Sequence, residues 1–349
     1  MVAGAPVSLS EDQNRQEAPT IGVVIVTFNA ADVIGECLTS LMMQAGGRPH
    51  IVVVDNSSTD GTVAAIRDWA AAPGRPGLSE LHWPGATDEV EGVCLIHSGA
   101  NRGFAGGVNI GLAHLAARPG IGHFWILNPD AFADPGATGA ILAAAARWPD
   151  YGMMGGRVQY AEPPCNIQID GGTINRWTGV TGNINLGRPA SAPQPEAREV
   201  DFVTGANLVV SRRFYETVGP MREDYFLYYE EVDWALRRGD LALVVAPGFL
   251  VHHHAGTAIG SPTLNRLASP FSIWFKYRGR MKFVRRFLPV SWPVAMAHAT
   301  AKALQLLLKG AWPQALTILA AVYGLPAPRM VRDRLSPDAQ EIAFGKHGR

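Results

Sequence analysis

Carboxylates follow several apolar runs of this sequence, at positions where they could do chemistry. The stretch FWILNPD ends an apolar run on Asp130, and HIVVVD ends another on Asp55. Further along, YYEEVDW brings three acids together, Glu230, Glu231 and Asp233. Carboxylates can hold a divalent cation or take a proton from a reacting group. A turn at the end of a strand explains any one of these cases, but it explains the whole set less well.

The elements that position these residues alternate between strands and helices from residue 21 onward. Apolar, β-branched runs at 21–28, 50–55, 93–98 and 123–127 are separated by segments with apolar residues at helical spacing, such as 31–44. This alternation predicts a mostly parallel α/β sheet with both faces covered. Open parallel sheets bind ligands beyond the carboxyl ends of their strands. The strand ends here are polar: Asn29, Asp55, the loop at Asn101, and Asp130.

The second half of the chain is predicted to be more irregular. Residues 155–200 are rich in Gly, Pro and Asn, which indicates a loop-rich β segment. A return strand and a helix are expected within 199–219. Residues 224–240 are expected to form a helix that opens with carboxylates and closes at Arg237, Arg238 and Gly239, as the helix dipole and C-cap preferences favour.

The segment 275–287, FKYRGRMKFVRRF, interleaves basic and aromatic residues ahead of apolar helical stretches. This pattern suits an anionic membrane surface. The alternative is a basic helix packed on the body of the protein. No run of 18 or more apolar residues occurs, so no transmembrane helix is predicted.

Composition narrows the class of protein. Lys plus Arg and Asp plus Glu balance at 30 each, so no global field indicates binding to nucleic acid. The three cysteines, Cys37, Cys94 and Cys165, are far apart and are expected to be buried thiols in a reducing compartment. Residues 1–19 lack the pattern of a signal peptide and are expected to be a disordered leader. A cytoplasmic protein, peripheral at the inner face of the cell membrane, is expected.

Six motifs in order carry a family resemblance: VVIVTFN, VVDNSSTDGT, NRGFAGGVNIG, LNPD, FVTGANLVVSRRFYETVG and FLYYEEVDWALR. Together they resemble the inverting family 2 glycosyltransferases, and within them the rhamnosyltransferase-like group. The resemblance covers about residues 20–260. It implies a GT-A fold, a Rossmann-like mostly parallel sheet with flanking helices. The expected organisation is a leader (1–19), a GT-A domain (20–265), a basic, amphipathic helical extension that associates with membrane (266–330) and a tail (331–349).

The resemblance implies that the strand ends grip a nucleotide sugar. Asp55 can accept hydrogen bonds from a base N–H or a ribose hydroxyl, whereas Ser57 and Asp60 are expected to close their own turn. The glycines of NRGFAGGVNIG let backbone approach the ligand ahead of a helix N-terminus. The residues expected to bind the nucleotide sugar are Thr27, Phe28, Asn29, Asp55, Asn101, Gly103, Phe104, Asn109 and Asn128.

Asp130 stands where the family carries its metal-binding acidic motif, and the resemblance implies Mg²⁺ or Mn²⁺ as cofactor. Asn128 replaces the first acid of that motif. One carboxylate is enough in principle, because phosphate oxygens and waters supply the other ligands of Mg²⁺. Of the histidines in VHHHAGT, His253 fits best as a second contact with the metal or the diphosphate. Alternate residues of a strand point to opposite sides, so three histidine ligands from this run are not expected.

Glu231 stands at the position of the family's catalytic base, which takes the proton of the acceptor hydroxyl. We expect the same helix to contribute Glu230, Asp233 and Trp234 to the acceptor side of the active site. The alternative for these acids is a solvated helix N-terminus stabilised by its dipole.

The predicted activity is inverting, metal-dependent transfer of a sugar from a dTDP- or UDP-sugar to a glycan or polyprenyl-diphosphate-linked acceptor, in bacterial polysaccharide or cell-wall synthesis. Rhamnose is the sugar that the resemblance suggests. Two alternatives stay open. A nucleotidyltransferase should have a Gly-rich basic loop after the first strand, which TFNAADVIGE lacks. A catalytically inactive scaffold that binds membrane or partner proteins would keep the fold without the chemistry.

Overall fold

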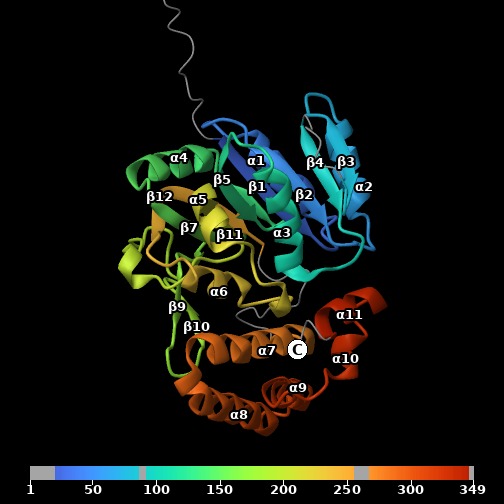
Figure 1. The fold of residues 1–349 in the computed structure, drawn as a ribbon, viewed down its shortest axis with the longest axis vertical. Helices are drawn as coiled ribbons and strands as arrows, with labels where there is room; N and C mark the ends of the chain where they lie inside the picture. The colour runs from blue at the N-terminus through green and yellow to red at the C-terminus, as the bar shows by residue number, and fades with distance from the viewer. Residues whose placement is uncertain (1–19, 86–91, 255–266, 346–349) are drawn as a thin grey trace, which may run out of the picture.

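A computed structural model describes residues 20–85, 92–254 and 267–345 (Figure 1). Its centre is a sheet of ten strands in the order β3-β4-β2-β1-β5-β11-β7-β12-β6, with β8 beside β7. The strands β1 to β5 pair with one another in parallel. Beyond them, β11 lies between β5 and β7 and is antiparallel to both. The strands are β1 (Thr20–Thr27), β2 (His50–Asp55), β3 (Leu78–His82), β4 (Val93–His97), β5 (Ile121–Leu127), β6 (Ala131–Ala133), β7 (Tyr151–Tyr160), β8 (Ile167–Ile169), β11 (Asn207–Ser211) and β12 (Ala242–His253), with a separate hairpin of β9 (Gly172–Ile174) and β10 (Thr181–Asn183).

Helices cover both faces of this sheet, as the continuous apolar strands require (Figure 1). One face packs on α1 (Ile34–Met42), α2 (Thr62–Ala71) and α4 (Ala137–Arg147). The other packs on α3 (Gly103–Ala116), α5 (Arg212–Val218) and α6 (Glu230–Leu236). In β1 the alternation is clear, because Val23 and Ile25 belong to the first core and Val24 and Val26 to the second. The prediction of an α/β sheet covered on both faces is confirmed.

The strand register brings the polar strand ends to one edge. Thr27 pairs with Asp55, and Ile25 pairs with Leu127, so Asn128 to Asp130 continue along the same edge. Neighbouring strands lie about 4.8 Å apart, which places the ends of β2 and β5, on either side of β1, about 10 Å apart. The end of β12 joins them, because His253 pairs with Ala131.

Five helices follow the sheet and lie below it in Figure 1: α7 (Pro270–Phe287), α8 (Trp292–Leu308), α9 (Trp312–Val322), α10 (Arg329–Arg332) and α11 (Pro337–Phe344). Residues 331–345 of the expected tail include α11, and Val331, Leu335 and Ala339 are buried in a core shared with α7. Within the described residues, no helix is long and apolar enough to cross a membrane. The expected leader, 1–19, and the expected domain boundary at 265 lie outside the described residues.

The helix expected over 224–240 is shorter than the sequence predicts. It begins at Glu230 and ends at Leu236, and the chain before it is a 3-10 turn followed by irregular backbone. Phe226, Tyr228 and Tyr229 have positive φ angles of 65°, 66° and 75° there. A right-handed helix needs negative φ angles, so the helix cannot extend back through these aromatic residues. Positive φ is uncommon for large side chains, which is why the sequence does not predict this interruption.

Candidate active site

Asp55 is a buried carboxylate at the end of β2, with 4% of its surface exposed. It accepts a hydrogen bond from the Thr27 hydroxyl (3.4 Å) and from the backbone N–H of Ser58 (3.2 Å to Oδ2). Thr27 is itself fully buried. The hydrogen bond between Thr27 and Asp55 therefore joins the ends of β1 and β2, and Asp55 lies buried at the carboxyl ends of the strands.

Asn29 links the end of β1 to the turn after β2. Its side-chain oxygen accepts from the Thr59 N–H (2.8 Å), and its backbone N–H donates to Ser58 Oγ (3.0 Å). Asp60 accepts hydrogen bonds from the backbone N–H groups of Thr62 (2.9 Å) and Ala31 (3.2 Å). Burial tends to raise the pKa of the Asp60 carboxyl, but the hydrogen bonds with Thr62 outweigh it and hold that pKa below its usual range. The carboxylate thus has the turn-closing bonds that its sequence position predicts. Phe28, between the two strand ends, is half-buried.

The loop before α3 has the close backbone approach that its glycines allow. Asn101 Oδ1 accepts from the Gly103 N–H (2.9 Å), and the Phe104 N–H donates to the Phe226 carbonyl (2.8 Å). Gly103 has a φ of +71°, and a Cβ there would lie 2.2 Å from that carbonyl oxygen. This contact joins the loop to the irregular chain that precedes α6.

Asp130 and His253 meet at the ends of β5 and β12. Nε2 of His253 lies 2.9 Å from Oδ1 of Asp130 and 3.4 Å from the Asn128 amide nitrogen. Nδ1 of His253 donates to Oε1 of Gln168, 2.8 Å away, because an amide oxygen can only accept. With its proton on Nδ1, His253 turns Nε2 toward the Asp130 carboxylate, so these two atoms are placed where they would contact one metal ion together.

The geometry of this pair fits a metal site. Two ligands at right angles, each about 2.1 Å from one octahedral ion, lie about 3.0 Å apart, close to the 2.9 Å that separates Nε2 and Oδ1. Imidazole nitrogen and carboxylate oxygen both suit Mn²⁺. In the described part of the chain, no cluster of three or more His, Cys, Asp or Glu residues could hold a metal alone. The remaining positions of such an ion would therefore fall to ligand oxygens and water.

The two neighbouring histidines have other partners. His252 stacks on Phe132, with ring centroids 5.0 Å apart. His254 lies between Glu36 and Glu162, 2.9 Å from each carboxylate, and these hydrogen bonds, working against burial, raise its pKa. The structure thus selects His253 from the run of three.

A short loop, residues 204–206, connects the Asp130 side of the edge to the acids of α6. The Asn128 N–H donates to the Ala206 carbonyl (3.1 Å). A Cβ on Gly205 would lie 3.1 Å from the Phe104 ring and 4.0 Å from Cβ of Glu231. Asn128 and Glu231 therefore flank the same loop, and a ligand at the strand ends would have Asp130 and His253 on one side and the acids of α6 on the other.

Glu230 and Glu231 at the start of α6 differ in environment. Glu230 is buried, and its Oε2 has no hydrogen-bond partner among the described residues. Burial, and then the charge of Glu231, raise the pKa of Glu230 well above its usual range. Glu231 is only partly covered. Desolvation raises its pKa too, while backbone hydrogen bonds and the Lys276 charge oppose the rise. Glu231 is the acid of this pair that a substrate can reach.

The backbone that presents these acids is strained and tightly held. Residues such as Tyr228 and Tyr229 with positive φ cost on the order of 1–3 kcal/mol each and persist where their surroundings fix them. The Tyr229 hydroxyl donates to the Gly179 carbonyl (2.8 Å), and that of Tyr228 pairs with Ser272 (2.8 Å). Gly279 of α7 packs so close that a Cβ would lie 2.7 Å from the Tyr228 carbonyl oxygen. Helix α7 is therefore part of the support of the site.

Three residues expected at the site have structural partners instead. Asp233 is fully buried and accepts hydrogen bonds from the Tyr225 hydroxyl (2.9 Å) and from Arg237 Nε (2.7 Å). Trp234 is also fully buried, and its indole N–H donates to the Gly219 carbonyl (2.9 Å). The side-chain nitrogen of Asn109 donates to the Met221 carbonyl and to Glu223, and its side-chain oxygen accepts from the Met221 N–H.

Three further residues support the site and are not among those that the sequence predicts. Gln168 orients His253 from β8, in the loop-rich segment where no function is predicted. Asn56 follows Asp55, is buried, and donates to the Gly103 carbonyl (2.8 Å). Lys276 comes from α7, whose basic residues the sequence assigns to membrane. Asn56 lies inside the VVDNSSTDGT motif and could have been singled out. Gln168 and Lys276 depend on tertiary packing.

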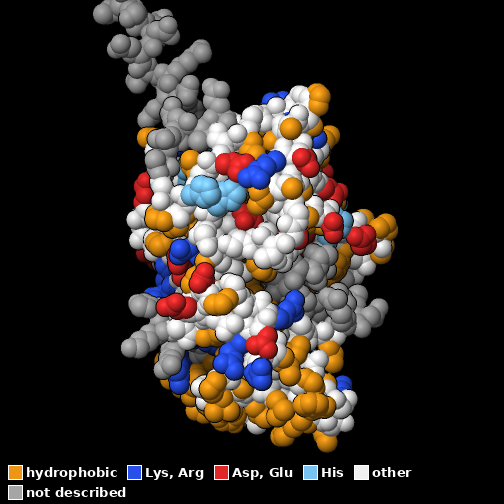
Figure 2. Space-filling view, turned by 90° about the vertical axis from the view of Figure 1, so that its right-hand side faces the viewer, with side chains coloured by type: hydrophobic (Ala, Val, Ile, Leu, Met, Phe, Trp, Pro, Cys, Tyr) orange, Lys and Arg blue, Asp and Glu red, His pale blue; other side chains and the backbone are white. Residues whose placement is uncertain are grey.

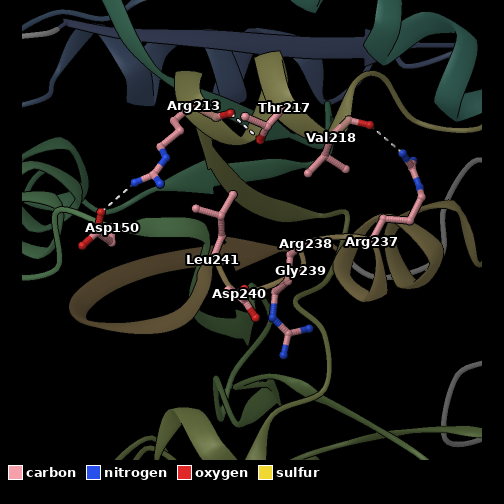
Figure 3. Close-up of a pocket in the computed structure, with 9 residues that line it drawn as sticks. All are labelled: Asp150, Arg213, Thr217, Val218, Arg237, Arg238, Gly239, Asp240 and Leu241. Carbon is pink, nitrogen blue, oxygen red and sulfur yellow. Dashed lines mark hydrogen bonds and ion pairs between the residues drawn. The ribbon is translucent and has the colours of Figure 1, made fainter.

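A pocket of about 550 Å³ lies at the opposite end of the strands, where β7 and β12 begin (Figure 3). Arg213 reaches Asp150 across it (2.7 Å), and Arg237 donates to the Val218 carbonyl (3.0 Å). Its arginines therefore have partners in the protein, and it shares no residue with the strand-end edge. We assign it no part in the site.

The sequence of this region identifies a family. Residues 22–164, which include Asp55, the loop before α3 and Asp130, match the family described as "Glycosyl transferase family 2". This segment is similar to the family 2 glycosyltransferases, and the longer chain is similar in sequence to a rhamnosyltransferase.

Two characterised relatives span most of the chain. An N-acetylglucosaminyl-diphospho-decaprenol L-rhamnosyltransferase of Mycobacterium tuberculosis is 29% identical over 272 residues, 71% of this chain and 80% of the relative. The low-salt glycan biosynthesis hexosyltransferase Agl10 of Haloferax volcanii is 23% identical over 219 residues, 62% of this chain and 61% of the relative.

Solved structures show the same fold. The mannosyltransferase PcManGT of Pyrobaculum calidifontis, in complex with GDP-Man and Mn²⁺, aligns with a TM-score of 0.50 at 18% identity over 95% of this chain and 82% of that one. GalNAc-T7, solved with UDP, GalNAc and Mn²⁺, aligns with a TM-score of 0.56 at 14% identity over 94% of this chain and 58% of that one. The expected GT-A fold with a helical C-terminal region is confirmed.

Proposed function

We propose that the protein transfers a sugar, with inversion, from a nucleotide-diphosphate donor to a hydroxyl of a lipid-diphosphate-linked glycan. The observation that carries this proposal is the pairing of Asp130 with His253 at the strand ends, across the 204–206 loop from Glu231. The mycobacterial relative uses an L-rhamnosyl donor and a diphospho-decaprenol acceptor by its name, and dTDP-rhamnose is the donor we propose first.

The residues divide the work between donor and acceptor. Asp55, Thr27 and Asn29 line the end of the sheet where the nucleotide would lie, with Asn101 and Phe104 opposite them. Asp130 and His253 would hold Mg²⁺ or Mn²⁺, which neutralises charge on a leaving diphosphate when bound. These assignments agree with the contacts above and leave Asn109, Asp233 and Trp234 as supports.

Glu231 is the proposed base. Its carboxylate takes the proton of the acceptor hydroxyl as that oxygen attacks the anomeric carbon from the face opposite the diphosphate. The bond from the anomeric carbon to the phosphate oxygen breaks, and the diphosphate leaves with the electron pair. The new glycosidic bond therefore has inverted configuration.

A donor panel tests this proposal. Purified protein is incubated with dTDP-rhamnose, UDP-GlcNAc, UDP-galactose or GDP-mannose, a polyprenyl-diphospho-GlcNAc acceptor and Mg²⁺ or Mn²⁺, and released nucleoside diphosphate and glycosylated lipid are measured. We expect metal-dependent product from one donor. Glu231→Gln should lower kcat at least about 100-fold while donor binding is retained. No product from any donor would favour the inactive scaffold, and an unchanged rate in Glu231→Gln would overturn the assignment of the base.

A further inference from the structure

The C-terminal helices enclose a basic cavity on the side of α7 away from Glu231. It has a volume of about 890 Å³ and lies between α7, α8 and the end of α9. One acid, Asp224, faces five cations in its lining: Arg278, Lys282, Arg285, Arg286 and Arg332. The cavity therefore carries a large excess of positive charge.

One nitrogen of this basic lining has no hydrogen-bond partner among the described residues. Asp224 accepts from both Arg286 and Lys282, and Arg285 lies over the Trp292 ring, 4.2 Å from its centroid. Nη1 of Arg278 is buried without a hydrogen-bond partner among the described residues. Burial, and then the charge of Arg278, lower the pKa of Lys282 to about 8. An anion in the cavity would relieve both effects, because it would pair with Arg278 and favour the charged form of Lys282.

The cavity adjoins an exposed apolar surface. Among the described residues, ten of the fourteen large hydrophobic side chains that are strongly exposed lie between Val290 and Met330. They include Leu308, 90% exposed, and Trp312, 59% exposed. Tyr323 and Leu325, both more than half exposed, also line the cavity, so the two features are continuous. In Figure 2, Lys and Arg side chains lie directly above the hydrophobic surface at the lower end of the molecule, where Figure 1 places α8 and α9.

We infer that this end of the protein docks on a membrane of anionic phospholipids, with the phosphate of a lipid headgroup in the cavity and the apolar side chains of α8 and α9 in the acyl region. A phospholipid bilayer presents phosphate and hydrocarbon side by side, as the cavity and the apolar surface do. A second copy fits less well, because a symmetric contact through this surface would bring two basic cavities together.

This arrangement changes the sequence-based expectation for 275–287. The basic residues of that segment do not form one exposed row along α7. Arg280 is buried against Tyr277, and Arg286 and Lys282 pair with Asp224, so α7 packs on the body as the alternative interpretation has it. The membrane contact falls instead on α8, α9 and the mouth of the cavity. The inference rests on the proposed function only in that a lipid-linked acceptor lies in a membrane.

Vesicle flotation of the full chain tests the inference. The vesicles are phosphatidylcholine alone or with 30 mol% phosphatidylglycerol (roughly the anionic content needed for a strong surface potential), and they contain no acceptor lipid. We expect binding to the anionic vesicles about tenfold or more above binding to the neutral ones. Arg278→Gln with Arg332→Gln should remove most of that difference, and Leu308→Gln with Leu316→Gln should weaken binding to both.

Matched controls are available on the sheet domain. Arg48→Gln and Met43→Gln replace an exposed arginine and an exposed large hydrophobic residue far from the cavity in sequence, and neither should change binding. Arg332 is itself exposed, so Arg332→Gln alone provides a variant that leaves the interior intact. Thermal unfolding of each variant checks the fold.

Three results would overturn the inference: no binding of the wild type to anionic vesicles, equal binding of the cavity variant and the wild type, or self-association in place of vesicle binding. Millimolar inorganic phosphate separates the sources of the anion. If phosphate raises the melting temperature but vesicles do not bind, the cavity takes a soluble anion and the membrane inference fails. Turnover of a water-soluble acceptor is measured in parallel, so failure of the proposed activity and failure of docking are distinguished.

Discussion

The imidazole of His253 lies with Nε2 2.9 Å from Oδ1 of Asp130, while its Nδ1–H is held by Gln168. The two residues are 123 positions apart, and the pairing of β12 with β6, which begins at the residue after Asp130, brings them together. With its proton on Nδ1, the ring turns Nε2 toward the carboxylate, and these are the two atoms that we propose as ligands of one metal ion.

We expect His253→Gln to weaken binding of Mn²⁺ in the presence of dTDP or UDP by about 10–100-fold, and Asp130→Asn to weaken it at least as much. The reason is the loss of one of the two protein ligands. Titration calorimetry, or the electron paramagnetic resonance of free Mn²⁺, measures it. His252→Gln is the matched control, because that ring stacks on Phe132 and should leave the affinity unchanged. Equal affinities in all variants would remove both residues from the metal site.

Lys276→Met should move the acidic limb of the kcat/KM profile to higher pH. Desolvation raises the pKa of Glu231 and the Lys276 charge opposes this rise, so removing the charge lets the pKa increase further. A base must be deprotonated to act, and activity is therefore lost at a higher pH in the variant. Lys302→Met, an exposed change on α8, should leave the limb in place. A limb that stays fixed or moves down in Lys276→Met contradicts the assignment of Glu231.

Glu230→Gln should stabilise the protein at neutral and alkaline pH and have little effect in acid. The folded state raises the pKa of Glu230, so its protonated form is favoured there and wild-type stability falls as pH rises through that value. Each unit of such a rise costs the folded state about 1.4 kcal/mol at high pH. Urea unfolding of the wild type and the variant, from about pH 4, near the ordinary pKa of Glu, to about pH 8.5, measures the difference in unfolding free energy. The exposed Glu341→Gln is the control. A stability difference that shrinks as pH rises would show that Glu230 is charged and paired.

Gly103→Ala should destabilise the protein more than Gly187→Ala. The two glycines have nearly the same φ, +71° and +75°, so an alanine suffers the same backbone strain at both. Only at Gly103 would the new Cβ meet an atom, the Phe226 carbonyl oxygen at 2.2 Å, whereas nothing lies within 4 Å at Gly187. We expect an additional loss of about 1–3 kcal/mol in the unfolding free energy of the Gly103 variant. Equal losses would mean that the loop before α3 moves freely away from Phe226.

The sheet and its polar edge could be predicted because their signals are local. Each strand is a short apolar run, and Asp55 and Asp130 follow the runs directly. Register then brings the ends together without further information. The choice of His253 among three histidines also came from a short pattern, and its contact with Asp130 agrees with that choice.

Other parts of the site depend on contacts between distant segments. Gln168 lies 85 positions from His253, in a segment without periodicity. The sequence predicts a start of α6 that is too early, because the positive φ angles of Phe226 and Tyr229 accompany contacts with α7 and with the loop before α3, which are distant in sequence. The partners of the basic residues in α7 also depend on tertiary contacts. Arg286 pairs with Asp224 and Arg280 lies over Tyr277, and the periodicity of the sequence does not predict either contact.

The close contact of Gly279 with the Tyr228 carbonyl has a consequence for modular exchange. Domain boundaries drawn by the family match would end the catalytic part well before α7, and swapping or truncating there would leave the left-handed turn before Glu230 without its backing. A chimaera that keeps the sheet of this protein must also keep α7 with it. Because Gly279 lies in the helix that leads on to α8, the placement of Glu231 relative to the C-terminal helices depends on a residue that has no side chain.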